Sequence, residues 1–235
     1  MDAITQLKTA KVNELVLDLR YNGGGFLDIS SQLGWMIGDA TLAGKVFEKT
    51  SCNDKNPFAI CNIAGSFQQR SMGFSPNQLP AGQTLPQLGL NRVFVLTKSG
   101  TCSASESIIN GLSPFMQVIR IGSTTCGKPY GFYYTDNCGT SYAAMQFKGE
   151  NANGFGDYAD GFAPTCQVAD DLSKQRGDPS ELMFSGALTY IRTGTCPAVT
   201  TGIQKPLVSN LLHGDFPVLR SKHEEIRLLG RPSGL

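Results

Sequence analysis

Histidine is scarce in this sequence of 235 residues: His213 and His223 are the only two, and both lie in a polar C-terminal stretch. A Ser-His-Asp active site needs a histidine beside its nucleophile, and neither histidine lies near the glycine-rich segments in sequence, so this chemistry is not expected. The charge is balanced, with 20 basic and 19 acidic residues, which argues against a surface for nucleic acid or an anionic membrane. No apolar run approaches the roughly 18 residues that a transmembrane helix needs.

The chain also lacks a C-x-x-C pair, although it has seven cysteines. A zinc or thioredoxin-like site is therefore not expected. Seven cysteines are many for a reducing compartment and indicate an extracytoplasmic one, periplasmic or extracellular in a bacterial cell envelope. We expect local disulfides between Cys52 and Cys61, Cys126 and Cys138, and Cys166 and Cys196, which leaves Cys102 free. The alternative is that several cysteines act as small buried hydrophobic residues.

Alternating sequence patterns predict an α/β fold. Residues 50–91 have no sustained period and look like a surface excursion that frames a groove. The last helix is expected to start with Asp178 as N-cap, Pro179 at its first position and Glu181 three residues after the cap. The expected helices are 2–11, 27–37, 104–112 and 178–191, and the expected strands are 14–19, 93–96, 118–121, 130–134 and 142–147.

Ser103 follows an apolar strand-like run and begins the segment Ser103-Ala104-Ser105-Glu106. A serine at a helix N-terminus lies beside unpaired backbone N–H groups that can stabilise an oxyanion, and the Ala104 N–H is the natural first donor. The same four residues match a capping box, serine with glutamate three positions later, which requires no chemistry at all. Both interpretations remain open at this point.

Three consecutive glycines, Gly23, Gly24 and Gly25, follow Asn22 where a strand ends and a helix begins. They could simply form a sharp turn with positive φ angles. They could also present bare N–H groups to an anion, in which case Gly24 supplies the second oxyanion donor and Asn22 holds the turn in shape.

Lys128 lies in a Gly-Lys pair twenty-five residues after Ser103. A lysine can take the proton of a serine hydroxyl if burial lowers its pKa. The segment from Gly122 to Lys128 also has the spacing of a phosphate-binding loop, but that loop continues with Ser or Thr and a helix. Here Pro129 and β-like residues follow, so no nucleotide is expected. A surface lysine in a turn is the ordinary alternative.

The three motifs in combination resemble the C-terminal processing (tail-specific) serine protease family over roughly residues 13–195. The motifs are Leu17-Asp18-Leu19-Arg20-x-Asn22-x-Gly24-Gly25, Ser103-Ala104-Ser105-Glu106 and Gly127-Lys128. The resemblance implies that Ser103 is the nucleophile and Lys128 its base. Ala104 and Gly24 would form the oxyanion hole, and Asn22, Gly23, Gly25 and Glu106 would support the site. It also implies a β/β/α superhelical core of the crotonase/Clp-protease type.

The chain departs from that family in several ways. Many members carry a PDZ domain and a helical region upstream, whereas about a dozen residues precede the first strand here. The segment starting at Met1 has no signal peptide, so we expect the sequence to be part of a longer precursor. Some members have a glutamine four residues past the lysine, where this chain has Phe132, so a Ser-Lys dyad is expected. The usual Phe before Gly-Lys is Cys126.

The expected function is a serine endopeptidase of the C-terminal processing type that binds an extended protein segment by β-augmentation. Residues 1–195 would form the catalytic core and residues 196–235 a C-terminal extension. No metal, cofactor or nucleic acid is expected. One alternative is a non-catalytic peptide-binding or scaffold module that keeps the family core. Another is an acyl-CoA enzyme of the crotonase class, which the lack of a basic adenine-binding cluster disfavours.

Overall fold

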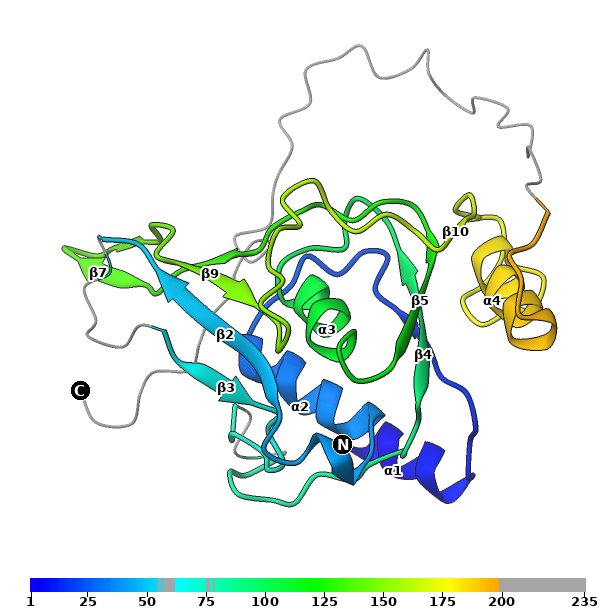
Figure 1. The fold of residues 1–235 in the computed structure, drawn as a ribbon, viewed down its shortest axis with the longest axis horizontal. Coiled ribbons are helices and arrows are strands. Elements are labelled where there is room, and N and C mark those ends of the chain that lie inside the picture. Colours follow the sequence, from blue (N-terminus) through cyan, green and yellow to red (C-terminus); the bar gives the residue numbers. More distant parts are fainter. Residues whose placement is uncertain (55, 57–61, 75–76, 78, 199–235) are drawn as a thin grey trace, which may run out of the picture.

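A computed structural model describes residues 1–54, 56, 62–74, 77 and 79–198 (Figure 1). Its first sheet has the order β1-β4-β5-β10, and all neighbouring strands are parallel. The sequence predicted the first three of these strands, whereas β10 was not expected. The bounds are β1 Val16–Asp18, β4 Arg92–Thr97, β5 Gln117–Gly122 and β10 Cys166–Gln167.

The parallel sheet is buried on both faces because β4 alternates two apolar sets. Val93 and Val95 pack into the same core as helices α2 (Leu27–Ile37) and α3 (Ala104–Leu112). Phe94 and Leu96 join the opposite core with Met183 and Ala187 of α4 (Leu182–Thr193). Figure 1 accordingly shows α4 on one side of β4 and β5, and α2 and α3 on the other.

A second, antiparallel sheet of order β3-β2-β9-β6 lies on the far side of α2 and α3. Phe47 of β2 reaches both helices at glycines: a Cβ on Gly111 or Gly34 would lie 2.6 or 3.4 Å from its ring. The bounds are β2 Val46–Cys52, β3 Ala64–Ser66, β6 Tyr130–Gly131 and β9 Phe147–Glu150. The molecule is thus layered as helix, parallel sheet, helices and antiparallel sheet, a mixed α/β fold as the sequence predicted.

The remaining elements belong to neither of the two main sheets. They are α1 Asp2–Thr9, the 3-10 turn η1 Ala40–Leu42, and the hairpin of β7 Thr135–Asn137 with β8 Thr140–Tyr142. Among them, α1 packs Ile4 into the core that α2 and α3 share. The hairpin turn at Cys138 and Gly139 was predicted, but the expected strands 130–134 and 142–147 are wrong: the hairpin pairs β7 with β8, and only the ends of the expected ranges are strand, in β6, β8 and β9. No helix in the described part of the chain is long and apolar enough to cross a membrane. Most of the expected extension, including His213 and His223, lies outside the described residues.

The start of α4 corrects the sequence prediction. Asp178 does not cap the helix; its carboxylate accepts bonds from the Ser180 N–H and hydroxyl in a preceding turn. Glu181 is the N-cap, with its side chain accepting from the N–H groups of Met183 and Phe184. The cap moved because Glu181 also binds a buried arginine, described below, and local signals do not report such a tertiary contact.

Candidate active site

Three loops that leave the carboxyl ends of parallel strands carry the three sequence motifs. In the sheet register, Asp18 pairs with Leu96 and Thr97 pairs with Gly122, so β1, β4 and β5 end at the same edge. Binding sites in open parallel sheets are found at this edge. The loops after these strands lead to Gly24, Ser103 and Lys128 respectively, so residues that are distant in sequence are brought together.

Ser103 sits in a strained turn between β4 and α3. Its φ of 56° and ψ of −117° are unusual for a residue with a side chain, at a typical cost of about 1–3 kcal/mol. It has the arrangement of a capping box with Glu106, yet its buried Oγ has no hydrogen-bond partner. A cap would use that oxygen, and strain of this kind gathers at functional positions. The hydroxyl of Ser103 is therefore not engaged as a helix cap, and its backbone is strained.

Gly24 lies directly against the serine. Its φ is +113°, and a Cβ at this position would lie 2.8 Å from the Ser103 Cβ and 3.0 Å from the Ala104 nitrogen. No side chain fits without displacing the turn that holds Ser103. Both the backbone angle and the close approach thus require glycine, and the Gly24 and Ala104 backbones lie side by side.

Asn22 ties the glycine turn to the serine loop. Its Oδ1 accepts hydrogen bonds from the Gly24 N–H and from the Ser105 hydroxyl, both at 2.9 Å. Its backbone oxygen accepts from the Cys102 N–H at 3.1 Å. Asn22 thus links the glycine turn to the serine loop through both its side chain and its backbone. Because the Gly24 N–H is engaged by Asn22, this donor must turn away from Asn22 before it can bind an oxyanion.

Glu106 joins the serine segment to the lysine segment. Its fully buried carboxylate accepts the N–H groups of Ser103 and Lys128 on one oxygen, at 3.0 and 2.8 Å. The other oxygen accepts the Gly127 N–H at 2.8 Å and the Thr125 hydroxyl at 2.5 Å. Charge-assisted bonds of this kind are among the stronger ones in proteins. The sequence had indicated Glu106 only as a helix cap and motif residue.

Lys128 is half-buried, and its Nζ lies 5.8 Å from the centre of the Phe132 ring. The backbone of the Lys128 loop packs closely against the segment of Ala159. At Gly127, φ is +83° and a Cβ would lie 2.0 Å from the Ala159 oxygen. Phe132, which stands where some relatives have glutamine, is thus an apolar neighbour of the ammonium group and cannot orient it by a side-chain hydrogen bond.

The cysteine pairing differs from the prediction at the site itself. Cys102 and Cys126 form a disulfide with 5.2 Å between their Cα atoms, whereas Cys138 is free and exposed. The expected Cys126–Cys138 pair and free Cys102 are therefore wrong. The Cys126 N–H donates to the Thr101 oxygen at 3.0 Å, which brings these two loops together, while Cys138 occupies a distant hairpin turn. Local spacing could not report this long-range contact.

The other cysteines agree with the prediction as far as they are described. Cys166 and Cys196 form a disulfide, which confirms that pair. Cys52 is disulfide-bonded, and Cys61 lies outside the described residues. The Sγ atoms of Cys102 and Cys126 and a carboxylate oxygen of Glu106 lie within 4.8 Å of one another, but sulfurs joined in a disulfide are not the thiolate ligands that a metal needs.

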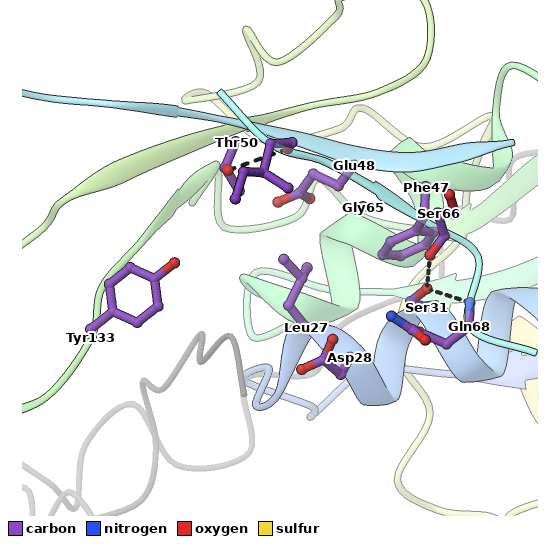
Figure 2. A pocket seen from close by; sticks show the side chains of 11 residues that line it. Leu27, Asp28, Ser31, Phe47, Glu48, Thr50, Gly65, Ser66, Gln68 and Tyr133 are labelled. Atoms are coloured by element: carbon purple, nitrogen blue, oxygen red, sulfur yellow. Dashed lines mark hydrogen bonds between the residues drawn. The ribbon is translucent and has the colours of Figure 1, made fainter. Parts of the chain in front are cut away.

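A pocket of about 90 Å³ opens between the start of α2, strands β2 and β3, and Tyr133. Figure 2 shows the side chains of Leu27, Glu48 and Tyr133 directed towards it. Its described lining includes the carboxylates of Asp28 and Glu48 and no lysine, arginine or histidine. Burial, together with the charge of Asp28, raises the pKa of the Tyr133 hydroxyl. Any side chain that enters here meets a mainly apolar surface that also carries two acidic side chains.

This pocket lies beside the serine segment. Leu27 follows Gly25 by two residues, and the Ser30 hydroxyl in the first turn of α2 donates to the Ala104 oxygen at 2.8 Å. The first turn of α2 therefore contacts the helix that Ser103 begins, and the same turn forms one wall of the pocket.

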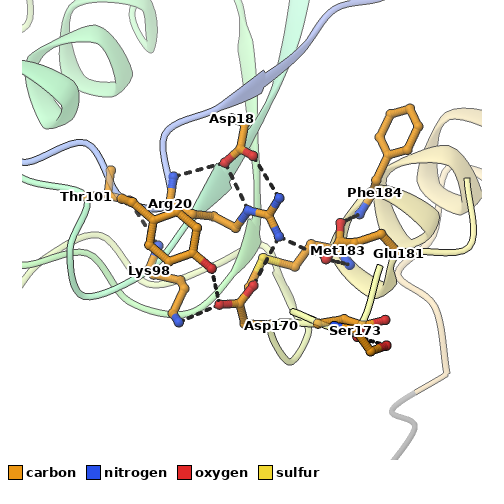
Figure 3. A network of polar contacts seen from close by, with 11 residues as sticks. Asp18, Arg20, Lys98, Thr101, Asp170, Ser173, Glu181, Met183 and Phe184 are labelled. Atoms are coloured by element: carbon orange, nitrogen blue, oxygen red, sulfur yellow. Dashed lines mark hydrogen bonds and ion pairs between the residues drawn. The ribbon is translucent and has the colours of Figure 1, made fainter. Parts of the chain in front are cut away.

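Behind the glycine turn lies an ion-pair network centred on Arg20, which is only 4% exposed (Figure 3). Its guanidinium binds Asp18 through two nitrogens, at 2.9 and 2.7 Å. A third nitrogen binds Asp170 at 3.1 Å and Glu181 at 2.9 Å. Asp170 in turn accepts the ammonium of Lys98 at 2.6 Å. The network links the loop after β1 to the loop after β4 and to the start of α4.

Burial, hydrogen bonds and neighbouring charges in this network shift the pKa values of Asp18, Tyr21 and Asp170. Burial tends to raise the pKa of Asp170, but hydrogen bonds from Lys98 and Tyr21 and the charges of Lys98 and Arg20 outweigh it and lower the pKa. Asp18 behaves in the same way through Arg20. Burial, followed by the hydrogen bond to Asp170, raises the pKa of Tyr21 to about 12. At neutral pH the carboxylates of Asp18 and Asp170 are therefore charged and the phenol of Tyr21 is protonated.

The sequence interpretation missed this network. Asp18 and Arg20 belong to the first motif, but the sequence did not predict that they form ion pairs. It gave no indication of Lys98 or Asp170. The one available signal was an arginine two residues after an aspartate at the end of a buried strand, since a buried arginine requires carboxylate partners. The identity of its distant partners could not be read locally.

Comparisons with known proteins agree with this geometry. Residues 1–132, which include Ser103 and Lys128, match the model of peptidase family S41. A crystal structure of a Bacteroides fragilis protein assigned to the S41 proteases is 31% identical, with a TM-score of 0.70, over 83% of this chain and 48% of that one. No match was found among curated proteins.

The photosystem II D1 C-terminal processing protease aligns with a TM-score of 0.50 and 22% identity, over 72% of this chain and 38% of that one. At this identity the likeness bears on the fold alone. The chain thus spans about half or less of the length of these structures. The family match and the identity to the bacterial structure show that the chain belongs to peptidase family S41, the C-terminal processing proteases that its three motifs resemble.

Proposed function

We propose that this chain is the catalytic core of a serine endopeptidase that uses Ser103 as nucleophile and Lys128 as general base. The observation that carries the proposal is the state of Ser103: a strained backbone and a buried hydroxyl without a partner, tied through the Glu106 carboxylate to the backbone of Lys128. Membership of a peptidase family supports a protein substrate.

In the proposed reaction, neutral Lys128 takes the proton of the Ser103 hydroxyl as Oγ bonds to the carbonyl carbon of the peptide. The negative charge moves to the carbonyl oxygen, which the N–H groups of Ala104 and Gly24 stabilise once Gly24 leaves Asn22. Loss of one such donor typically costs about 100- to 1000-fold in rate. Lys128 returns the proton to the leaving amine as the C–N bond breaks. Water, activated by the same lysine, then hydrolyses the ester on Ser103.

We further propose that the substrate binds as an extended segment. Strand β6 (Tyr130–Gly131) follows Lys128 directly and lies at an edge of the antiparallel sheet. An edge strand offers unpaired backbone groups to an added strand, and the adjacent pocket at Leu27 and Tyr133 would take a substrate side chain. The proposal includes a superhelical core of the crotonase/Clp type, a catalytic core over residues 1–195, and residues 196–235 as an extension.

The disulfides support an extracytoplasmic location, periplasmic or extracellular, as the second part of the proposal. Isolation of the protein from its native compartment, with thiols blocked at lysis, tests this. Recovery of Cys102 and Cys126 as free thiols would contradict it.

The test of the reaction is cleavage of an unstructured peptide by the protein at the length its gene encodes. Ser103→Ala and Lys128→Ala are expected to abolish cleavage, and a fluorophosphonate probe should label Ser103 in the wild type. Ser113→Ala and Lys174→Ala, both at exposed positions, serve as matched controls and should retain activity. Unchanged cleavage by either of the first two variants refutes the dyad. Folded protein that neither cleaves nor reacts with the probe would instead support the peptide-binding alternative.

A further inference from the structure

The Cys102–Cys126 disulfide, here called the inter-loop disulfide, joins the two loops that carry the proposed catalytic pair. Cys102 immediately precedes Ser103, and Cys126 lies two residues before Lys128. The two loops leave different strands, β4 and β5, so the chain itself does not fix the spacing between them. The disulfide holds their Cα atoms 5.2 Å apart.

The same contact region holds the backbone angles of Ser103. A strained φ of 56° persists only where surrounding contacts over-determine it. The backbone oxygen of Thr101, the residue before Cys102, accepts a hydrogen bond from the Cys126 N–H at 3.0 Å. The N–H of Cys102 donates to the backbone oxygen of Asn22 at 3.1 Å. The disulfide is the covalent member of this set, so its loss would free the residue before Ser103 to relax.

Glu106 bridges the same two loops through hydrogen bonds alone. Such bonds keep the loops together but tolerate small shifts, whereas a disulfide restricts both distance and orientation. A displacement of about 1 Å between reacting groups can cost on the order of 100-fold in rate. The fold can therefore survive the loss of the disulfide while the reactive geometry does not.

We propose that the inter-loop disulfide is a positioning element for catalysis: it holds the strained Ser103 and the Lys128 loop in reactive register, beyond any contribution to stability. The inference rests on the proposed Ser-Lys reaction. It assigns a role to two cysteines that the three family-like motifs do not include, since Cys126 stands where relatives usually have Phe.

The protein contains a matched control. Cys166 and Cys196 form a second disulfide with a sequence separation of 30, against 24 for the inter-loop disulfide. Loops of similar length restrict the unfolded chain to a similar degree. The control pair joins the edge strand β10 to the segment after α4, and neither cysteine belongs to the loop of Ser103 or of Lys128. A purely stabilising role predicts similar effects of both deletions.

The experiment compares Cys102→Ala/Cys126→Ala with Cys166→Ala/Cys196→Ala and the wild type, at the encoded length. For each protein, peptide cleavage gives kcat and KM, the rate of fluorophosphonate labelling is followed against pH, and thermal unfolding reports stability. Loss of the inter-loop disulfide should lower kcat and the labelling rate by about 10- to 100-fold. KM should change by less than about 2-fold, because the pocket proposed for a substrate side chain is built from α2, β2, β3 and Tyr133, outside the two joined loops. The control should keep kcat within about 2-fold of the wild type.

A second measurement covers the case in which the inter-loop variant does not fold. Here a phosphine reductant opens the inter-loop disulfide in Cys52→Ala/Cys166→Ala/Cys196→Ala protein, in which the other described disulfide-bonded cysteines are absent. EDTA is present because the thiols of Cys102 and Cys126, together with Glu106, could bind metal. Each disulfide gains two electrons and two protons to give two thiols, and the phosphine becomes its oxide with oxygen from water. Near-ultraviolet circular dichroism monitors the fold, and reoxidation should restore kcat.

Three results overturn the inference. The first is an inter-loop variant with kcat within about 2-fold of the wild type. The second is an equal loss of kcat in the control variant. The third is loss of the native circular dichroism signal on reduction in step with activity, which would make the disulfide merely stabilising. Retained cleavage by Ser103→Ala or Lys128→Ala is a separate outcome that refutes the underlying reaction, so the two failures are distinguishable.

Discussion

Replacing Glu106 by glutamine is the sharpest test of how the site is built. The two carboxylate oxygens accept four donors: the N–H groups of Ser103, Gly127 and Lys128 and the hydroxyl of Thr125. Glutamine is almost the same size but offers one acceptor oxygen and one donor NH₂ group. In either orientation of the glutamine amide, its NH₂ group therefore faces two hydrogen-bond donors: the N–H groups of Ser103 and Lys128, or the Gly127 N–H and the Thr125 hydroxyl.

The loss in the free energy of unfolding can be estimated from the more favourable orientation of the glutamine amide. With the NH₂ group facing Thr125 and Gly127, the threonine hydroxyl can turn to accept, which leaves the Gly127 N–H unsatisfied at a cost of about 1–3 kcal/mol. The two bonds that remain lose their charge assistance, roughly half their strength. The smaller desolvation cost of a buried neutral amide offsets part of this. We expect a net loss of about 2–4 kcal/mol in the free energy of unfolding.

Unfolding is best measured by denaturant titration in a Ser103→Ala background, which prevents self-cleavage and keeps the backbone bond to Glu106. A loss of this size lowers the midpoint of thermal unfolding by roughly 4–16 °C in a domain of this length. In the active background, kcat should fall on the order of 100-fold because both catalytic segments shift. Glu150→Gln, at a half-buried position on β9, is the control and should stay within about 0.5 kcal/mol. A Glu106→Gln protein that matches this control in stability and cleaves at the wild-type rate would refute the reasoning.

Three further outcomes follow from named contacts. Gly24→Ala should abolish peptide cleavage, since its Cβ would press on Ser103, whereas Gly25→Ala is strained but has no atom within 4 Å and should retain more activity; equal kcat values would contradict this. The lowered pKa of Asp170 gives stability that is present above its unfolded pKa of about 3.9 and is lost as pH falls through the folded value. Denaturant midpoints should therefore decline below about pH 4 more steeply in wild type than in Asp170→Asn. The raised pKa of Tyr21, about 12, gives stability that is lost as pH rises from about 10 towards that value. In Tyr21→Phe the denaturant midpoint should therefore decline less steeply with alkaline pH than in the wild type. An unchanged slope would argue against the hydrogen bond from Tyr21 to Asp170.

The sequence determined those features that depend on local periodicity and local turn chemistry. Helices α2 and α3 have the bounds that apolar spacing predicted, because a helix face repeats within a few residues. The apolar run from Val93 to Leu96 identified a strand buried on both faces. The glycine run located a turn in which Gly24 cannot carry a side chain.

The sequence also located the candidate site, because residue types at fixed offsets carry chemical information. Ser103 and Lys128 could be named from their motifs and from the scarcity of histidine. The strained backbone of Ser103 could not, since the residues just before it, Thr101 and Cys102, are held by distant groups, the Cys126 N–H and the Asn22 oxygen.

Only the tertiary structure decided which distant groups meet. Strand order brings the loops after β1, β4 and β5 to one edge, and this proximity joins Cys102 to Cys126. The segment after β10 and the start of α4 bring Asp170 and Glu181 to Arg20, which already has Asp18 two residues before it in sequence. The start of α4 moved for the same reason, because Glu181 serves both the helix and that arginine. Contacts between groups far apart in the chain depend on the folded geometry, which a short stretch of sequence does not contain. In the cysteine pairing and at the start of α4, these contacts outweighed the preferences of the local sequence.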